Sequence, residues 1–256
     1  MASEAIPSYA SPPLTEVAFG IQFTPVALQT AHVGKFWTEV GTDFPLTQDA
    51  PPLPDVAETP SVSLLTMPPL RRSLLVSKDT EYLLQIQDSK FFHNWRRSSG
   101  DSKYPRFKTL FPSFVAYWKR FSEFLAQQRL GTPVPVRYEL TYVNALENVG
   151  NMKVEESVKL VNWDSFNTGF LHSPETANTA WVFALPDAKG KITVGTNRAI
   201  RDKGQSAVVL SLSCSGEAKD KQYSIEQWFD TAHEYIVRGF TDLTTEPAQK
   251  VWGRER

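Results

Sequence analysis

The chain has 256 residues, of which 41% are hydrophobic and 12% aromatic, and this supports one large domain or two small ones with well-filled cores. The formal net charge of −1 excludes a global field that would draw the protein to nucleic acid or to an anionic membrane, so any basic surface must be local. The single cysteine, Cys214, excludes an intramolecular disulfide and a thiolate-cluster metal site, and it favours a reducing cytoplasm.

The N-terminal segment, residues 1–13, is rich in serine, proline and alanine and is expected to form an extended arm. It has neither the basic region nor the apolar region of a signal peptide. No run elsewhere in the sequence approaches the roughly 18 apolar residues of a membrane span, so we expect no membrane association.

The first half, residues 14–150, begins with a clean alternation in which Val17, Phe19, Ile21 and Phe23 share one face. This period of two predicts a half-buried strand over 16–23. Later patterns predict five more elements: a helix over 30–44, strands over 71–77 and 81–87, a helix over 107–130 and a strand over 136–146. The order strand, helix, strand, strand, helix, strand is the ferredoxin-like βαββαβ order.

The second half, residues 151–256, is expected to be a β-meander closed by a C-terminal helix. Its candidate strands lie at 154–163, 179–185, 191–200 and 207–213. Ser224 and Gln227 match a capping box, which predicts the start of the helix. The whole chain therefore predicts an α+β fold: two antiparallel sheets, or one continuous sheet, with long helices on one face. At the end of the chain, Val251 and Trp252 are apolar and indicate that the tail docks on its own body.

The stretch from Leu83 to Phe107 carries the most specific side chains of the sequence. It starts as a strand and becomes a basic-aromatic segment, residues 90–107, in which cations alternate with rings: Lys90, Phe91, Phe92, Trp95, Arg96, Arg97, Lys103, Tyr104, Arg106 and Phe107. Arginine forks and aromatic faces can hold phosphates and stack bases. In the alternative interpretation the aromatic side chains fill the core and the arginines are solvated. We expect the aromatic side chains to be buried.

The candidate ligand contacts of this segment are therefore its arginines. We expect Arg96, Arg97 and Arg106 to make the contacts, with Asn94 and Tyr104 as their supports. A second candidate surface is the strand that ends the first half, whose residues would line any cleft between the two halves: Tyr138, Glu139, Tyr142 and Asn144. Ordinary strand alternation explains the same pattern.

Motifs for catalysis and for metal or cofactor binding are missing from the sequence. There is no phosphate-binding glycine loop, dinucleotide fingerprint or nucleophile elbow. The histidines lack the spacing of a zinc site, and strand carboxylates such as Glu16, Glu81 and Glu139 usually face solvent. We therefore predict no catalytic residue, metal or cofactor. A site assembled from dispersed residues, such as His93 or Glu139, remains the enzymatic alternative.

Several short motifs together resemble a known family. They are Pro12-Pro13-Leu14 with Glu16-Val17, Gln85-Ile86-Gln87, Asn94-Trp95-Arg96-Arg97, Tyr104-Pro105-Arg106, Tyr142-Val143-Asn144 and Trp252-Gly253-Arg254. In these motifs the chain resembles a sporadically distributed family of uncharacterised prokaryotic proteins. The resemblance spans nearly the whole chain and implies a cytoplasmic protein of the kind carried in mobile or defence-associated gene clusters. It implies no reaction, cofactor or catalytic residue.

The missing motifs and the basic-aromatic segment predict a non-enzymatic binding protein, and the resemblance implies that it belongs to a prokaryotic defence or toxin-neutralising system. It would recognise a protein or an anionic ligand through the basic-aromatic segment. One alternative is a protein that binds RNA or single-stranded nucleic acid. Another is an enzyme, such as a nuclease or a nucleotide hydrolase, with a dispersed site.

Overall fold

The computed structural model of the chain describes residues 5–53, 70–148, 154–159, 176–200, 206–218 and 222–255. Its elements are, in chain order, β1 (Leu14–Phe23), α1 (Thr30–Val40), β2 (Leu46–Ala50), β3 (Arg72–Val76), β4 (Tyr82–Gln87), β5 (Lys90–Arg96), α2 (Phe107–Gln127), β6 (Pro135–Leu146), the 3-10 turn η1 (Val154–Ser157), β7 (Thr176–Ala184), the 3-10 turn η3 (Pro186–Ala188), β8 (Lys191–Ile200), β9 (Ser206–Glu217), α3 (Ile225–Leu243) and α4 (Glu246–Val251).

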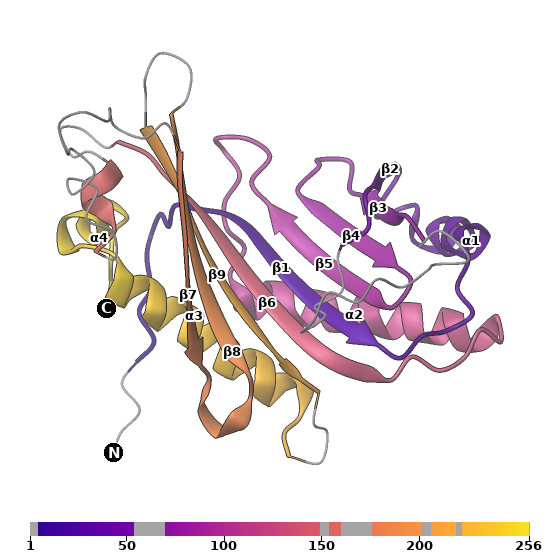
Figure 1. Cartoon of the computed structure of the whole chain (residues 1–256). Coiled ribbons are helices and arrows are strands. Elements are labelled where there is room, and N and C mark those ends of the chain that lie inside the picture. The colour runs from indigo at the N-terminus through magenta and orange to yellow at the C-terminus, as the bar shows by residue number, and fades with distance from the viewer. Residues whose placement is uncertain are drawn as a thin grey trace. The chain divides into compact units, whose positions relative to one another are not determined.

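The fold is α+β, as the sequence predicts, with helices packed on one nine-stranded antiparallel sheet. The strand order is β2-β3-β4-β5-β1-β6-β9-β8-β7 (Figure 1). The chain divides into two compact units, which we call the central unit (residues 18–138) and the terminal unit (residues 1–17 and 139–256). Strands β1 and β6 run through both units.

The central unit has an aromatic core between its strands and the helix α2. Alternation along β1 directs Phe19 and Phe23 to this side, and both side chains are buried. The ring centroid of Phe19 lies 5.4 Å from that of Phe114 on α2. The helix α1 closes the core with Phe36, whose ring centroid lies 5.3 Å from that of Phe121. Burying rings of this size provides several kcal/mol of hydrophobic stabilisation, roughly 1.5–3 kcal/mol for each.

The strand β5 was not predicted as a strand. Residues 90–95 are all buried, so neither face shows the polar alternation that marks a half-buried strand. Asp88 and Ser89 form a two-residue turn that pairs Gln87 with Lys90 across β4 and β5. The order of the central unit therefore includes β2 and β5 in addition to the six predicted elements. The ferredoxin-like βαββαβ order is not shown.

The terminal unit contains the predicted meander and its closing helix. Strand β8 pairs antiparallel with β7 and with β9, and α3 packs on β8 and β9. The capping box at the start of α3 is confirmed: Gln227 N donates to Ser224 Oγ at 3.2 Å, and Ser224 N donates to Gln227 Oε1 at 2.9 Å. These two bonds satisfy backbone and side-chain groups at the helix terminus.

The tail docks on its own chain, as predicted. Trp252 is buried, and its ring centroid lies 5.3 Å from that of Phe240 on α3. The N-terminal arm pairs with the same segment, because Ala10 N donates to Gly253 O at 2.9 Å and Ser11 N donates to Trp252 O at 3.0 Å. The expected extended arm is thus tied down along residues 8–11.

Two sequence expectations fall partly outside the described residues. Of the strand predicted at 154–163, residues 154–157 form the 3-10 turn η1, and residues 160–163 are not described. The predicted boundary at 150 is likewise not described. Among the helices that the structure describes, none is both long enough and apolar enough to cross a membrane.

Candidate functional site

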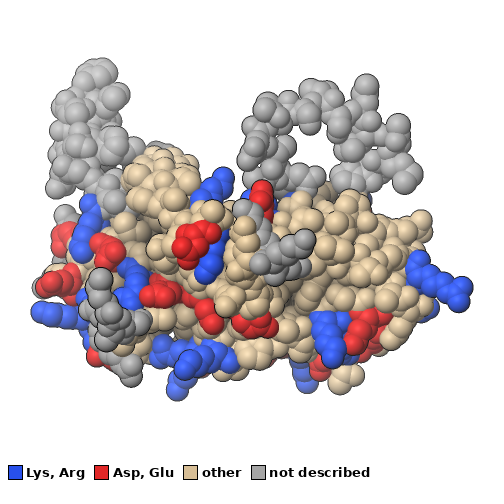
Figure 2. Space-filling view, turned by 90° about the horizontal axis from the view of Figure 1, so that it is seen from below, with Lys and Arg blue, Asp and Glu red and all other residues tan. Residues whose placement is uncertain are grey.

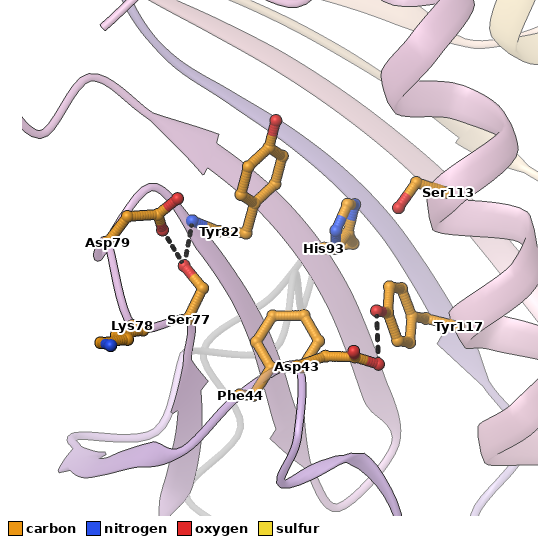
Figure 3. A pocket seen from close by; sticks show the side chains of 9 residues that line it. All are labelled: Asp43, Phe44, Ser77, Lys78, Asp79, Tyr82, His93, Ser113 and Tyr117. Carbon is orange, nitrogen blue, oxygen red and sulfur yellow. Dashed lines mark hydrogen bonds between the residues drawn. The ribbon is translucent and has the colours of Figure 1, made fainter.

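The central unit contains a pocket that opens beside His93, and we call it the His93 pocket. Its volume is about 720 Å³, and it is lined by Asp43, Phe44, Ser77, Lys78, Asp79, Tyr82, His93, Ser113 and Tyr117 (Figure 3). These residues come from the α1–β2 connection, the β3–β4 turn, β4, β5 and α2. The pocket thus brings together segments that are far apart in the sequence.

His93 is the most unusual residue of this pocket. Strand β5 directs it to the same side as Phe91 and Trp95, and its side chain is only 1% exposed. Neither ring nitrogen has a hydrogen-bond partner among the described residues. Leaving a buried polar group without a partner costs roughly 1–3 kcal/mol, so such a group needs an explanation.

Burial also decides the charge of His93. Desolvation lowers the pKa of the imidazole to about 4, so the ring is neutral at pH 7. A neutral imidazole offers one N–H donor and one acceptor nitrogen. Both groups lie beside the aromatic walls of the pocket, because the His93 ring centroid is 6.1 Å from that of Tyr82 and 5.5 Å from that of Tyr117. Figure 3 shows the imidazole among Tyr82, Ser113 and Tyr117.

Tyr117 is held in place by its hydroxyl group. The hydroxyl donates to Asp43 Oδ2 at 3.0 Å, and Arg120 Nη1 lies 3.3 Å from the same carboxylate oxygen. Burial, followed by the bond to Asp43, raises the pKa of Tyr117 to about 12, so the phenol stays neutral. The carboxylate of Asp43 is therefore already engaged by a phenol and a guanidinium.

The opposite rim of the pocket is formed by the β3–β4 turn. Ser77 Oγ donates to Asp79 Oδ1 at 2.5 Å, and Glu81 N donates to the same oxygen at 3.0 Å. The bond from Ser77 is the main reason that the pKa of Asp79 lies below its ordinary value. Lys78 is exposed in this turn. One lysine and two carboxylates line the pocket, and Arg120 offsets one carboxylate, so the pocket has no net charge that would favour an anion.

The arrangement does not form a nucleophile relay. A Ser–His–Asp relay needs the histidine hydrogen-bonded to both a hydroxyl group and a carboxylate. Although Ser113 and Asp43 line the same pocket, neither ring nitrogen of His93 bonds to them. A histidine with a pKa of about 4 is also a weak base at neutral pH. Within the described residues no group of acidic, histidine or cysteine side chains could hold a metal ion.

The side chains of the basic-aromatic segment differ in burial along its length. Its aromatic side chains Phe91, Phe92, Trp95 and Phe107 are buried, as expected. Asn94 is 1% exposed, and its Oδ1 accepts a hydrogen bond from Gln85 Nε2 at 2.8 Å. It therefore supports the β4–β5 pairing from inside. Lys90, also buried, approaches the carbonyl oxygen of Leu53 at 3.4 Å.

The three predicted contact arginines lie at the end of β5 and at the start of α2. Arg96 is half-buried and donates from Nε to Thr80 O at 2.7 Å, whereas Arg97 and Arg106 are exposed. The Arg106 guanidinium lies 5.8 Å from the ring centroid of Tyr104, whose own centroid is 5.5 Å from that of Trp95. Tyr104 thus links an exposed arginine to the buried core.

The strand residues predicted to face a cleft divide between two faces of β6. Tyr138, Tyr142 and Asn144 are buried, and Glu139 on the other face is half-exposed. Asn144 Nδ2 donates to Leu210 O at 3.2 Å, and Tyr142 Oη lies 3.0 Å from His233 Nδ1. The cleft itself stays a prediction.

Sequence reasoning missed most of the His93 pocket. Ser113, Tyr117 and Arg120 follow one another at helical spacing beside the apolar stripe of α2, which was the one signal available. Asp43 and Tyr82 reach the pocket only through tertiary structure. No family model matches this chain, and no curated protein matches it. The pocket must therefore be interpreted from its own chemistry.

Proposed function

We propose that this protein is a non-enzymatic binding protein that holds a small, uncharged, ring-containing compound of the nucleoside class in the His93 pocket. The observation that carries the proposal is the buried His93 imidazole, whose two ring nitrogens have no partner among the described residues. The two nitrogens point away from each other on the ring, so a base edge would pair with one of them once the side chains that cover it move, and nucleobase edges carry both donors and acceptors.

The aromatic side chains that line the pocket favour a ligand with a flat ring. Tyr82 and Tyr117 offer aromatic surface beside the imidazole, and base–aromatic stacking contributes roughly 1–3 kcal/mol per base. The hydroxyl group of Ser113 adds a polar contact of the kind that orients a ligand in a largely apolar pocket. Because Lys78 and Arg120 balance the two lining carboxylates, the pocket has no net charge that would attract a phosphate ester. The resemblance described above would place such a protein in a prokaryotic defence or toxin-neutralising system.

Calorimetric titration with adenosine and uridine, and with adenosine monophosphate for comparison, tests the proposal. We expect one nucleoside to bind, the monophosphate to bind more weakly, and His93→Leu to weaken binding by about tenfold to a hundredfold, because the hydrogen bond to the imidazole is lost. The matched control is His32→Leu, which removes a histidine of the same unit outside the pocket. Equal binding by His93→Leu and the unmodified protein would overturn the proposal.

A second candidate function rests on the contact arginines. Arg106 has φ 75° and ψ 153° at the N-cap of α2, a backbone region that is nearly restricted to glycine and costs roughly 1–3 kcal/mol. An arginine kept at a strained, exposed position favours a role for its side chain. We propose that Arg97 and Arg106 contact acidic groups of a partner protein, with Arg96 and Tyr104 supporting them.

The nucleic-acid alternative gains less support. Figure 2 shows acidic and basic side chains interspersed on the face that it presents, without a broad area of one sign. The rings that would stack bases, Phe91, Phe92 and Trp95, are buried. Binding to a single-stranded RNA would have to weaken steeply with salt, since phosphate contacts release counterions. A flat salt dependence would count against it.

A further inference from the structure

Strand β7 has an edge that no strand of the described residues covers. It is nine residues long and ends the sheet, and among the described strands it pairs only with β8. Figure 1 shows it beside β8 at the outer side of the meander. Natural edge strands are usually short, or they carry charges, prolines or bulges that prevent pairing with another chain. Residues 176–184 contain neither a charged residue nor a proline.

The opposite edge strand shows the contrast. Strand β2 has five residues and carries Asp49, whose carboxylate lies 3.7 Å from the Arg71 guanidinium. Both features are ordinary protection for an edge. In β7, by comparison, Val182 is 61% exposed and Phe183 is 47% exposed. An exposed apolar strand edge marks a surface that another strand covers.

The hairpin bond defines which backbone groups of β7 point outward. Leu185 N donates to Gly190 O at 2.8 Å, so residue 185 belongs to a hydrogen-bonded pair with β8. Because antiparallel pairs alternate, Phe183, Trp181, Thr179 and Ala177 also face β8 with their backbone groups. The N–H and C=O groups that face the open edge are therefore those of Thr176, Asn178, Ala180, Val182 and Ala184.

We propose that β7 pairs antiparallel with β7 of a second copy of this chain, about a two-fold axis through Ala180. Ala180 is the centre of the strand, so this axis alone pairs every residue of Thr176–Ala184. Ala180 then opposes itself, Asn178 opposes Val182, and Thr176 opposes Ala184 through backbone hydrogen bonds.

The side chains explain why a second copy fits this edge. Between the hydrogen-bonded pairs, Trp181 opposes Thr179 of the other copy, and Phe183 opposes Ala177. These are non-hydrogen-bonded pairs, in which the Cα atoms are only about 4.5 Å apart and the side chains are close. Each large ring therefore meets a small residue. An axis through Val182 would place Trp181 against Phe183 and would pair only residues 180–184 of the strand.

A register-specific cross-link provides the first test. The Cα atoms of a hydrogen-bonded antiparallel pair lie about 5.5 Å apart, within the range that a disulfide spans. Mild oxidation of an Ala180→Cys variant of the full chain should therefore give a disulfide-linked dimer on a non-reducing gel. The native Cys214 is buried, and burial raises the pKa of its thiol to about 12, so it does not compete.

The matched control is Val182→Cys, whose thiols would be about 13 Å or more apart in this register and should not cross-link alone. Mixing Asn178→Cys with Val182→Cys should restore the linked dimer. Cross-linking of Val182→Cys alone at the level of Ala180→Cys would overturn the proposed register.

Sedimentation of the unmodified full chain provides the second test, with a concentration-dependent dimer as the expected result. Ala180→Pro removes an outward N–H without breaking the β8 ladder, and Val182→Lys adds a charge to the edge; both should sediment as monomers. Val209→Lys, at an exposed position of β9 away from the edge, should remain dimeric. If Ala180→Pro loses its cooperative melt, the sedimentation of Val182→Lys alone decides whether the edge of β7 forms the dimer. A monomeric unmodified chain over the whole concentration range would overturn the proposal.

Discussion

The ring of Phe92 on β5 lies directly against Gly20 on β1: a Cβ atom at position 20 would come within 2.2 Å of Phe92 Cε1. Phe92 is itself buried, so the ring has little room to move. Gly20→Ala should therefore overpack this contact, which lies on the face of the sheet away from α2, and lower the free energy of unfolding by about 1–3 kcal/mol, as measured by urea titration.

Gly34→Ala is the matched control for this substitution. Gly34 lies inside α1, and an added Cβ meets nothing within 4 Å. Alanine loses less backbone entropy than glycine on folding, so this variant should gain roughly 0.5–1 kcal/mol. If the two alanine variants change stability in the same direction, the close packing of Phe92 on Gly20 is not what disfavours a side chain at position 20.

The buried histidines make stability depend on pH. The folded-state pKa of His93 is about 4 and lies below the ordinary value of 6.5 that an unfolded chain keeps, so the unfolded state binds more protons between these values. Stability is then fully present above about pH 6.5 and is lost as the pH falls towards 4. For His93 the loss is on the order of 3 kcal/mol at most. His233, with the same lowered pKa of about 4, acts in the same direction.

Urea titrations between pH 4 and pH 7, an interval taken from these pKa values, check this prediction. His93→Leu should show a flatter profile than the unmodified protein. At pH 7 it should be at least as stable, because it removes two buried nitrogens that lack partners. An unchanged slope in His93→Leu would show that protonation of His93 does not drive acid unfolding.

Docking of the tail should be visible in thermal stability. Trp252 is 7% exposed and packs on Phe240, so Trp252→Ala removes a large buried ring and should cost about 3 kcal/mol. Deleting residues 251–256 removes the same ring and should lower the melting temperature at least as far as Trp252→Ala does. The neighbouring Val251 is 48% exposed, and Val251→Ala should stay within about 0.5 kcal/mol. Equal melting temperatures for both alanine variants would contradict the docking.

Local signals account for the parts of this fold that the sequence predicts well. The capping box at Ser224 is contained within four residues, and β8 lies at the predicted 191–200, where the sequence on either side, 186–190 and 201–205, has the composition of a hairpin turn. Strand β5 was missed for a non-local reason. Lys90 and Asn94 are buried polar residues whose partners lie on other segments, so their burial cannot be read from periodicity.

The candidate site likewise divides into residues that local sequence signals predict and residues that only the tertiary structure brings together. The exposed arginines at 97 and 106 could be named from composition and turn chemistry. The His93 pocket could not, because Asp43 reaches it from a segment that precedes His93 by about fifty residues. Burial alone converts His93 from an ordinary strand residue into a neutral, unpartnered imidazole, and burial on both faces of a strand has no signature in the pattern of one sequence.

Replacing Arg106, whose backbone is strained, should change the stability of the protein and its binding to a partner in opposite directions. Glycine adopts φ 75°, ψ 153° without the steric cost that arginine bears there, so Arg106→Gly should raise the free energy of unfolding by about 1 kcal/mol. The same substitution removes an exposed guanidinium and should weaken binding to polyglutamate, the probe for an acidic partner. Arg96→Ala should lower the free energy of unfolding instead, because losing the bond to Thr80 O costs about 1 kcal/mol. If Arg106→Gly gains stability and keeps full polyglutamate binding, Arg106 does not contact acidic partners; if it loses stability, the Arg106 side chain contributes to folding instead.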